Sequence, residues 1–202
     1  MIEIDRSTPI WTITINRPEK AGALTEQMLI DLRDAARDAG QAAAVILTGT
    51  GKVFSAGADL DAARAGLATS PLWEELSGAI ADLPGLTIAA LNGTVAGGAT
   101  GMVLACDLRI AVPSAKFFYP VMKLGYLPQP SDPVRMAALI GTARTKMIFL
   151  GGQKLPAATA YEFGLVDELV ENGAVLDRAQ QLCIDIAAAK SETARAIKAM
   201  CR

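Results

Sequence analysis

Residues 53–60, Val-Phe-Ser-Ala-Gly-Ala-Asp-Leu, and residues 92–98, Asn-Gly-Thr-Val-Ala-Gly-Gly, are two turns built from small residues. Each follows an apolar run typical of a strand, and each leads into a helical stretch. Small residues at such a turn let the backbone itself touch a ligand. Two backbone N–H groups aimed at one point can hold a negatively charged oxygen. The two turns therefore indicate an enzyme scaffold without saying which reaction it carries.

The residues around the two turns alternate between strand and helix patterns. Thr25 is a good N-cap for the first helix, and two more helices are predicted over 71–83 and 97–105. Strands are predicted at 2–5, 10–15, 43–47, 86–91 and 108–112, with another near 165–170. This alternation predicts an α/β fold with right-handed crossovers. We expect a core domain over 1–171 and a C-terminal helical extension over 172–202.

Composition restricts the class of protein. The chain has 202 residues, 51% of them hydrophobic and 20% charged, with a formal net charge of -2. No basic excess points to nucleic acid as a partner. The first six residues lack the pattern of a signal peptide, and no apolar stretch is long enough to span a bilayer, so no membrane partner is expected. The three cysteines, Cys106, Cys183 and Cys201, favour a reducing compartment over a disulfide framework, which predicts a cytoplasmic protein.

The chain contains no histidine. Histidine general bases, Ser-His-Asp or Cys-His catalysis and the usual His-rich metal sites are therefore excluded, and no metal is expected. Proton transfer would need a carboxylate, Tyr, Lys, Cys, water or the substrate itself.

Two better-known glycine motifs do not fit. Residues 49–52, Gly-Thr-Gly-Lys, fail as a phosphate-binding loop because Ile46 stands where its first glycine belongs and Val53 replaces the required Ser or Thr. The glycines between 93 and 101 do not form a dinucleotide fingerprint. Either glycine cluster alone is more often a tight turn or a site of close packing.

Taken together and in order, the motifs resemble the enoyl-CoA hydratase/isomerase family, also called the crotonase family. The resemblance runs from Ile10 to about Lys198. The matching segments are 16–20 followed by 23–25, then 54–60, then 92–98 followed by 106–111, and finally 163–167. It implies a crotonase-like fold of repeated ββα units.

The resemblance also implies a substrate and a set of contacts. Members bind acyl-CoA thioesters so that the carbonyl oxygen meets two backbone N–H groups, which by position are those of Ala58 and Gly98. CoA enters as part of the substrate, no separate cofactor is expected, and an acyl-carrier thioester stays open. The residues at positions where the family contacts CoA are Lys20, Ala21, Ala56, Asp59, Leu60 and Arg64. The alternatives are solvated charges for Lys20 and Arg64, and a structural role at a helix start for Asp59.

The chain departs from the family at its acids. Hydratases of the family use two glutamates, and these positions hold Gly101 and Val121 here. A third position, at which many isomerases carry an acid, holds Gln129. An acyl-CoA lyase or isomerase that stabilises an enolate is therefore expected: an isomerase, a decarboxylase or an atypical hydratase rather than a two-glutamate hydratase. The alternative is a catalytically impaired acyl-CoA-binding or regulatory protein.

Three nearby residues are candidates to replace the missing acids. Tyr119, Tyr126 and Asp132 could transfer a proton if burial shifts the pKa values of their side chains. The alternative places the tyrosine hydroxyls at the surface and uses Asp132 to cap the helix that runs from Pro133. Cys106 lies on an apolar stretch and is interpreted as a small buried hydrophobic residue.

The resemblance implies assembly as a homotrimer or hexamer, which members commonly build with C-terminal helices. The match reaches about 191–198 and the sequence ends at Arg202. The chain is therefore expected to lack those helices.

Overall fold

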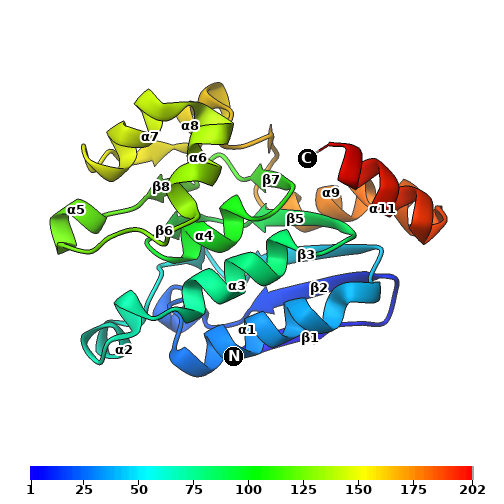
Figure 1. Cartoon of the computed structure of the whole chain (residues 1–202), viewed down its shortest axis with the longest axis horizontal. Coiled ribbons are helices and arrows are strands. Elements are labelled where there is room, and N and C mark those ends of the chain that lie inside the picture. Colours follow the sequence, from blue (N-terminus) through cyan, green and yellow to red (C-terminus); the bar gives the residue numbers. More distant parts are fainter. Residues whose placement is uncertain (202) are drawn as a thin grey trace.

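The computed structural model describes residues 1–201. The larger of its two sheets has six strands (Figure 1). The strands, in sheet order, are β1 (Ile2–Asp5), β2 (Ile10–Ile15), β3 (Ala44–Gly49), β5 (Leu86–Leu91), β7 (Leu108–Ala111) and β10 (Glu168–Leu169). The β1–β2 pair is antiparallel and all other neighbours are parallel. β3 and β5 are almost wholly buried, as their continuous apolar sequences predict for central parallel strands.

A second sheet positions the candidate site. Its strands are β4 (Val53–Ser55), β6 (Thr94–Ala96), β8 (Lys116–Phe118) and β9 (Leu155–Pro156). β4, β6 and β8 are parallel, so their carboxyl ends meet at one edge of the sheet. The residues that follow these strands, Ala58, Gly98 and Tyr119 among them, are thereby brought together.

Helices surround the two sheets. They are α1 (Glu26–Asp38), α2 (Leu60–Arg64), α3 (Leu72–Ala81), α4 (Ala99–Leu104), α5 (Val121–Leu124), α6 (Asp132–Ile140), α7 (Thr142–Phe149), α8 (Ala157–Phe163), α9 (Val175–Leu182), α10 (Ile184–Ala188) and α11 (Ser191–Met200). α1 packs against α3, α3 against α4, and α4 against α6. α9 contacts β3, β5 and β7. Lys198 of α11 donates to the Asp107 carboxylate over 2.7 Å.

Most sequence-based element predictions are confirmed. The Thr25 hydroxyl accepts a hydrogen bond from the Met28 amide, so Thr25 caps α1 as expected. The strand predicted near 165–170 is shorter, because only Glu168–Leu169 pairs with β7. The boundary at 171 stays a prediction, although Ala179 and Cys183 belong to the same buried core as the sheet. Within residues 1–201, the helices are too short or too polar for any of them to cross a bilayer.

Candidate active site

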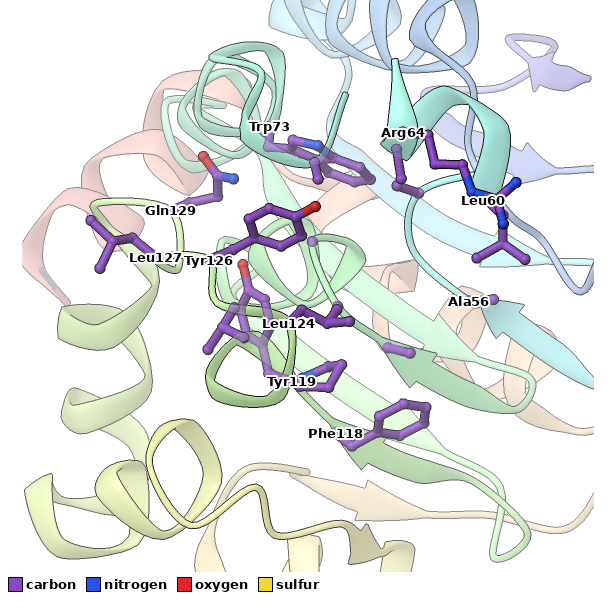
Figure 2. Close-up of a pocket in the computed structure, with 18 residues that line it drawn as sticks. Ala56, Leu60, Arg64, Trp73, Phe118, Tyr119, Leu124, Tyr126, Leu127 and Gln129 are labelled. Carbon is purple, nitrogen blue, oxygen red and sulfur yellow. The ribbon is translucent and has the colours of Figure 1, made fainter. Parts of the chain in front are cut away.

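A cavity of about 280 Å³ opens at the carboxyl ends of β4, β6 and β8. Figure 2 shows Trp73 at the top, Leu60 and Arg64 on the right, and Tyr126 and Leu127 on the left. The lining residues that belong to the predicted site, or stand at its acid positions, are Ala56, Ala58, Leu60, Arg64, Gly98, Tyr119, Val121, Tyr126 and Gln129. The pocket thus unites both small-residue turns with the chain that follows β8.

The Ala58 N–H group points away from its neighbouring chain. Ala58 forms a parallel bridge with Leu24, in which the Leu24 amide donates to Gly57 O and the Asp59 amide donates to Leu24 O, both over 2.8 Å. These bonds use the residues on either side of Ala58, so the Ala58 amide faces the opposite side. Within residues 1–201 it donates to no protein acceptor.

The Gly98 N–H group is also without a protein acceptor in the described chain. The preceding amide, that of Gly97, donates to Phe118 O over 3.1 Å and ties the second turn to β8. A Cβ atom on Gly98 would lie 2.9 Å from the Trp73 indole ring, so only glycine fits beneath that ring. The Trp73 Nε1–H group donates to Leu67 O over 2.8 Å, which fixes the ring over the turn.

The candidates for CoA contact divide into two groups. Ala56, Leu60 and Arg64 line the pocket, and the Leu60 side chain is 75% exposed at its rim. Lys20, Ala21 and Asp59 lie outside the pocket lining. Their contact with CoA stays a prediction.

Asp59 has the structural role proposed as its alternative. Its carboxylate accepts hydrogen bonds from the Asp61 and Ala62 amides at the start of α2, and it pairs with Arg17 over 2.9 Å. Burial alone would raise the pKa of this carboxyl. The two amides and the guanidinium nevertheless hold the Asp59 pKa below its ordinary value.

The three positions predicted to lack the family's acids lie at or beside the pocket. Val121 and Gln129 line it. Gly101 is buried in α4, one turn beyond Gly98, and a Cβ atom on it would lie 2.8 Å from Oδ1 of Asp132. The space beside Gly101 is therefore taken by a carboxyl group from α6.

Two of the proton-transfer candidates are buried and bonded to each other. Tyr119 is only 4% exposed. Its hydroxyl donates a hydrogen bond to Oδ2 of Asp132 over 2.9 Å. The alternative predictions for these residues are wrong. Ser131 is the N-cap of α6, and no Asp132 cap bond forms because the carboxyl points inward to Tyr119. Tyr126 lines the pocket and is 40% exposed, so its proton-transfer role and the alternative both stay predictions.

Burial shifts the pKa values of this pair. It is the main reason that the pKa of Asp132 rises to about 7, with the nearby Glu74 charge adding to the rise. The Tyr119 hydrogen bond and Arg135 partly oppose the rise in the Asp132 pKa. Burial, followed by the Asp132 charge, raises the pKa of Tyr119 well above its ordinary value. By contrast Cys106 is simply buried, which raises its thiol pKa to about 12 and makes it unreactive, as expected.

Sequence reasoning missed Trp73 and Glu74. Both lie on the predicted helix over 71–83, where an aromatic residue and a charge carry no sign of a site. Glu74 accepts hydrogen bonds from the Ser131 amide and hydroxyl over 3.2 and 3.0 Å, which ties α3 to the start of α6. The packing of α3 on α4 places Trp73 at the pocket, and the bonds to Ser131 place Glu74 near Asp132. No local pattern could have revealed either placement.

Comparisons with known proteins agree with this architecture. The family model for enoyl-CoA hydratase/isomerase matches residues 5–202. A protein of Mycobacterium tuberculosis named "Probable enoyl-CoA hydratase echA8" is 33% identical over 98% of this chain and 79% of its own length. The 1,2-epoxyphenylacetyl-CoA isomerase of Escherichia coli is 30% identical over 88% of this chain and 72% of its own length.

Solved structures of similar proteins have the same fold as this chain. The enoyl-CoA hydratase of Bacillus anthracis superposes with a TM-score of 0.89 and 32% identity, covering 96% of this chain and 79% of its own. DspI of Pseudomonas aeruginosa also gives a TM-score of 0.89 at 32% identity, covering 98% of this chain and 84% of its own. The match spans both sheets and the turns between them. The chain belongs to the enoyl-CoA hydratase/isomerase, or crotonase, family.

Proposed function

We propose that the chain is an isomerase that converts an acyl-CoA thioester to its enolate and moves a β,γ double bond into conjugation with the thioester. The observation that carries this proposal is the pair of unpartnered amides, those of Ala58 and Gly98, on one small pocket. Preorganised donors of this kind stabilise the negative oxygen that develops when a proton leaves the α carbon.

The missing acids favour isomerisation over hydration. Adding water to a double bond needs groups that activate water and protonate carbon, and each such group supplies about 10²–10⁴-fold. Gly101 and Val121 hold the positions of those groups in the family and carry no titratable side chain. Moving a double bond needs only one group that takes a proton and returns it. The E. coli relative is also named as an isomerase.

The shape of the pocket supports a thioester with its acyl group inside. Most of the lining is apolar, and Trp73, Ala96 and Val121 are among its buried members. Leu60 and Arg64 stand at the open rim, where the carrier portion would lie. The rim would accept CoA or the pantetheine arm of an acyl carrier protein, and kinetics with both thioesters distinguishes the two.

Two assays with the purified chain test the proposal. The first follows the ultraviolet absorbance of the conjugated product after addition of a β,γ-unsaturated acyl-CoA. The second follows deuterium uptake at the α carbon of butyryl-CoA in D₂O by mass spectrometry. We expect activity in both, and activity in neither rejects the proposal.

Two other functions are favoured by the same lack of acids. Decarboxylation generates an enolate by losing CO₂ and needs no protein base, so turnover of malonyl-type thioesters without isomerisation would replace our proposal with that one. A binding or regulatory protein needs the pocket alone. Calorimetry showing tight binding of acyl-CoA, together with no turnover of any thioester, would establish this second alternative.

A further inference from the structure

Asp132 carries a buried carboxyl group that has no role in the oxyanion site formed by the Ala58 and Gly98 amides. Asp132 is 0% exposed, and its Oδ2 atom accepts a hydrogen bond from the Tyr119 hydroxyl. Its Oδ1 atom is buried without any hydrogen-bond partner in the described chain. Buried carboxylates that serve only structure are normally fully bonded, since an unpaired buried oxygen is costly. This oxygen therefore calls for a functional explanation.

The Asp132 carboxyl group lies beside Gly101 of α4. Oδ1 lies against the backbone of Gly101, at a distance of 2.8 Å from where a Cβ atom would stand. Any larger residue at position 101 would have to displace the Asp132 carboxyl or be displaced by it. The glycine and the aspartate are thus matched, one on α4 and one on α6, and an acid occupies this part of the site from a different helix.

Tyr119 connects that carboxyl to the pocket. Tyr119 follows β8 directly, lines the cavity, and stands beside the second turn because the Gly97 amide is bonded to Phe118 O. Asp132 itself is not part of the lining. The Tyr119 ring is held by a tilted contact with Phe149, with centroids 5.1 Å apart. In Figure 2 the ring lies at the bottom of the pocket with its hydroxyl pointing up.

We infer that Tyr119 and Asp132 form a two-residue proton relay, in which Tyr119 exchanges the proton with the substrate and Asp132 holds it. This inference rests on the proposed isomerase function and names the groups that carry its proton.

In the relay step, one proton leaves the substrate for Tyr119 while another moves from Tyr119 to Asp132. The α C–H bond of the thioester breaks, and its electron pair moves to the carbonyl oxygen, which the Ala58 and Gly98 amides hold as an enolate. The proton forms an O–H bond with Tyr119 as the original Tyr119 proton passes to Oδ2 of Asp132. Negative charge has moved from the carboxylate to the enolate, and no phenolate forms. The reverse transfer, to the γ carbon, completes the isomerisation.

The charges around Asp132 suit this step. Glu74 on α3 and Arg135 on α6 face it with opposite signs, Tyr119 donates to it, and α4 has no titratable side chain. Burial and Glu74 raise the pKa of Asp132 to about 7, so its protonated and ionised forms are both populated near neutral pH. Because the relay starts from the carboxylate, turnover should rise as pH increases through that value.

Variants of the full chain test the relay with a β,γ-unsaturated acyl-CoA as probe. We expect Tyr119→Phe and Asp132→Asn each to lower kcat by about 10²-fold or more while KM changes by less than about threefold. The double variant should be no slower than about the slower single variant, since the two residues act as one unit. Tyr161→Phe and Asp185→Asn, at exposed positions on α8 and α10, are matched controls that should keep wild-type rates.

The pH profile separates a relay from a structural role. Asp132→Asn should abolish the rise in kcat/KM near an apparent pKa of about 7, and Glu74→Gln should move that rise to lower pH because a raising charge is lost. Thermal unfolding and CoA binding confirm that each variant is folded. The relay is overturned if Tyr119→Phe keeps its kcat, or if the rise survives in Asp132→Asn. If wild-type protein neither isomerises the probe nor exchanges α protons, the proposed function itself has failed.

Discussion

The Ala58–Gly98 side of the pocket is built from backbone, whereas the Tyr119–Asp132 side is built from side chains that three separate elements bring together. On the first side, two turns of small residues follow parallel strands, and their free amides result from the local hydrogen-bond pattern. On the second side, a carboxyl from α6 occupies space left by a glycine on α4 and bonds to a tyrosine after β8. The free amides follow from the local sequence of each turn. The carboxyl group beside the pocket comes instead from a helix that is distant in the sequence.

The largest effect should come from removing one amide on the backbone side. Gly98→Pro eliminates the N–H group and should lower kcat by about 10²–10³-fold, or about 3–4 kcal/mol of transition-state stabilisation. Gly98→Ala is the matched control, since it adds the same Cβ atom beneath Trp73 and keeps the donor. The rate ratio of the two variants, measured by isomerisation, isolates the amide. Equal rates would remove Gly98 from the oxyanion-holding role.

The next effect tests whether Gly101 and Asp132 are matched. Gly101→Glu places a Cβ atom 2.8 Å from Oδ1 of Asp132 and adds a like charge, so it should lower the free energy of unfolding by about 3 kcal/mol. In an Asp132→Ala background the same change should cost about 1 kcal/mol or less, because the space is open. Urea denaturation of the four proteins completes the double-mutant cycle. A cost that is the same in both backgrounds would show that the two positions are independent.

A third effect should appear in stability as a function of pH. The Asp132 pKa is raised from 3.8 to about 7 in the folded chain, so the protonated form is favoured by folding. This contribution is fully present below pH 3.8 and is lost as pH rises through about 7. Relative to Asp132→Asn, wild-type protein should therefore lose about 4 kcal/mol of unfolding free energy across that window. Denaturation at several pH values measures the difference, and a flat difference would contradict the raised pKa.

The smallest effect is expected at Asp59, which adjoins the backbone side but serves the fold. Asp59→Ala removes the cap of α2 and the partner of Arg17, and should lower Tm by about 2–4 °C. Its kcat should change by less than about threefold, since no proton passes through this carboxyl. Calorimetry and the isomerase assay give the two numbers. A large fall in kcat with an unchanged Tm would place Asp59 in the chemistry instead.

The backbone side of the pocket could be predicted from the sequence, whereas most of the side-chain side could not. The strands, the Thr25 cap and the two turns follow from local patterns, and the structure contains all of them. That the family's acid positions fall at Gly101, Val121 and Gln129 stays a prediction from the motifs. The run Ser131-Asp132-Pro133 is typical of a helix start, so the sequence favours Asp132 as a helix cap over a proton-transfer role. Its bond to Tyr119, and the placement of Trp73 over Gly98, depend on helix packing that no sequence window contains.

The indole ring of Trp73 has one more consequence. It lies directly on Gly98 at the pocket, while the only other tryptophan, Trp11, lies on β2 beneath the Arg6 guanidinium at 4.6 Å. The chain therefore carries its own fluorescent probe of the pocket. In a Trp11→Phe protein, the emission comes from Trp73 alone and should change in wavelength or intensity as a thioester enters beside it. A fluorescence titration with acyl-CoA thus reads occupancy of the pocket in real time, even where turnover is too slow to follow.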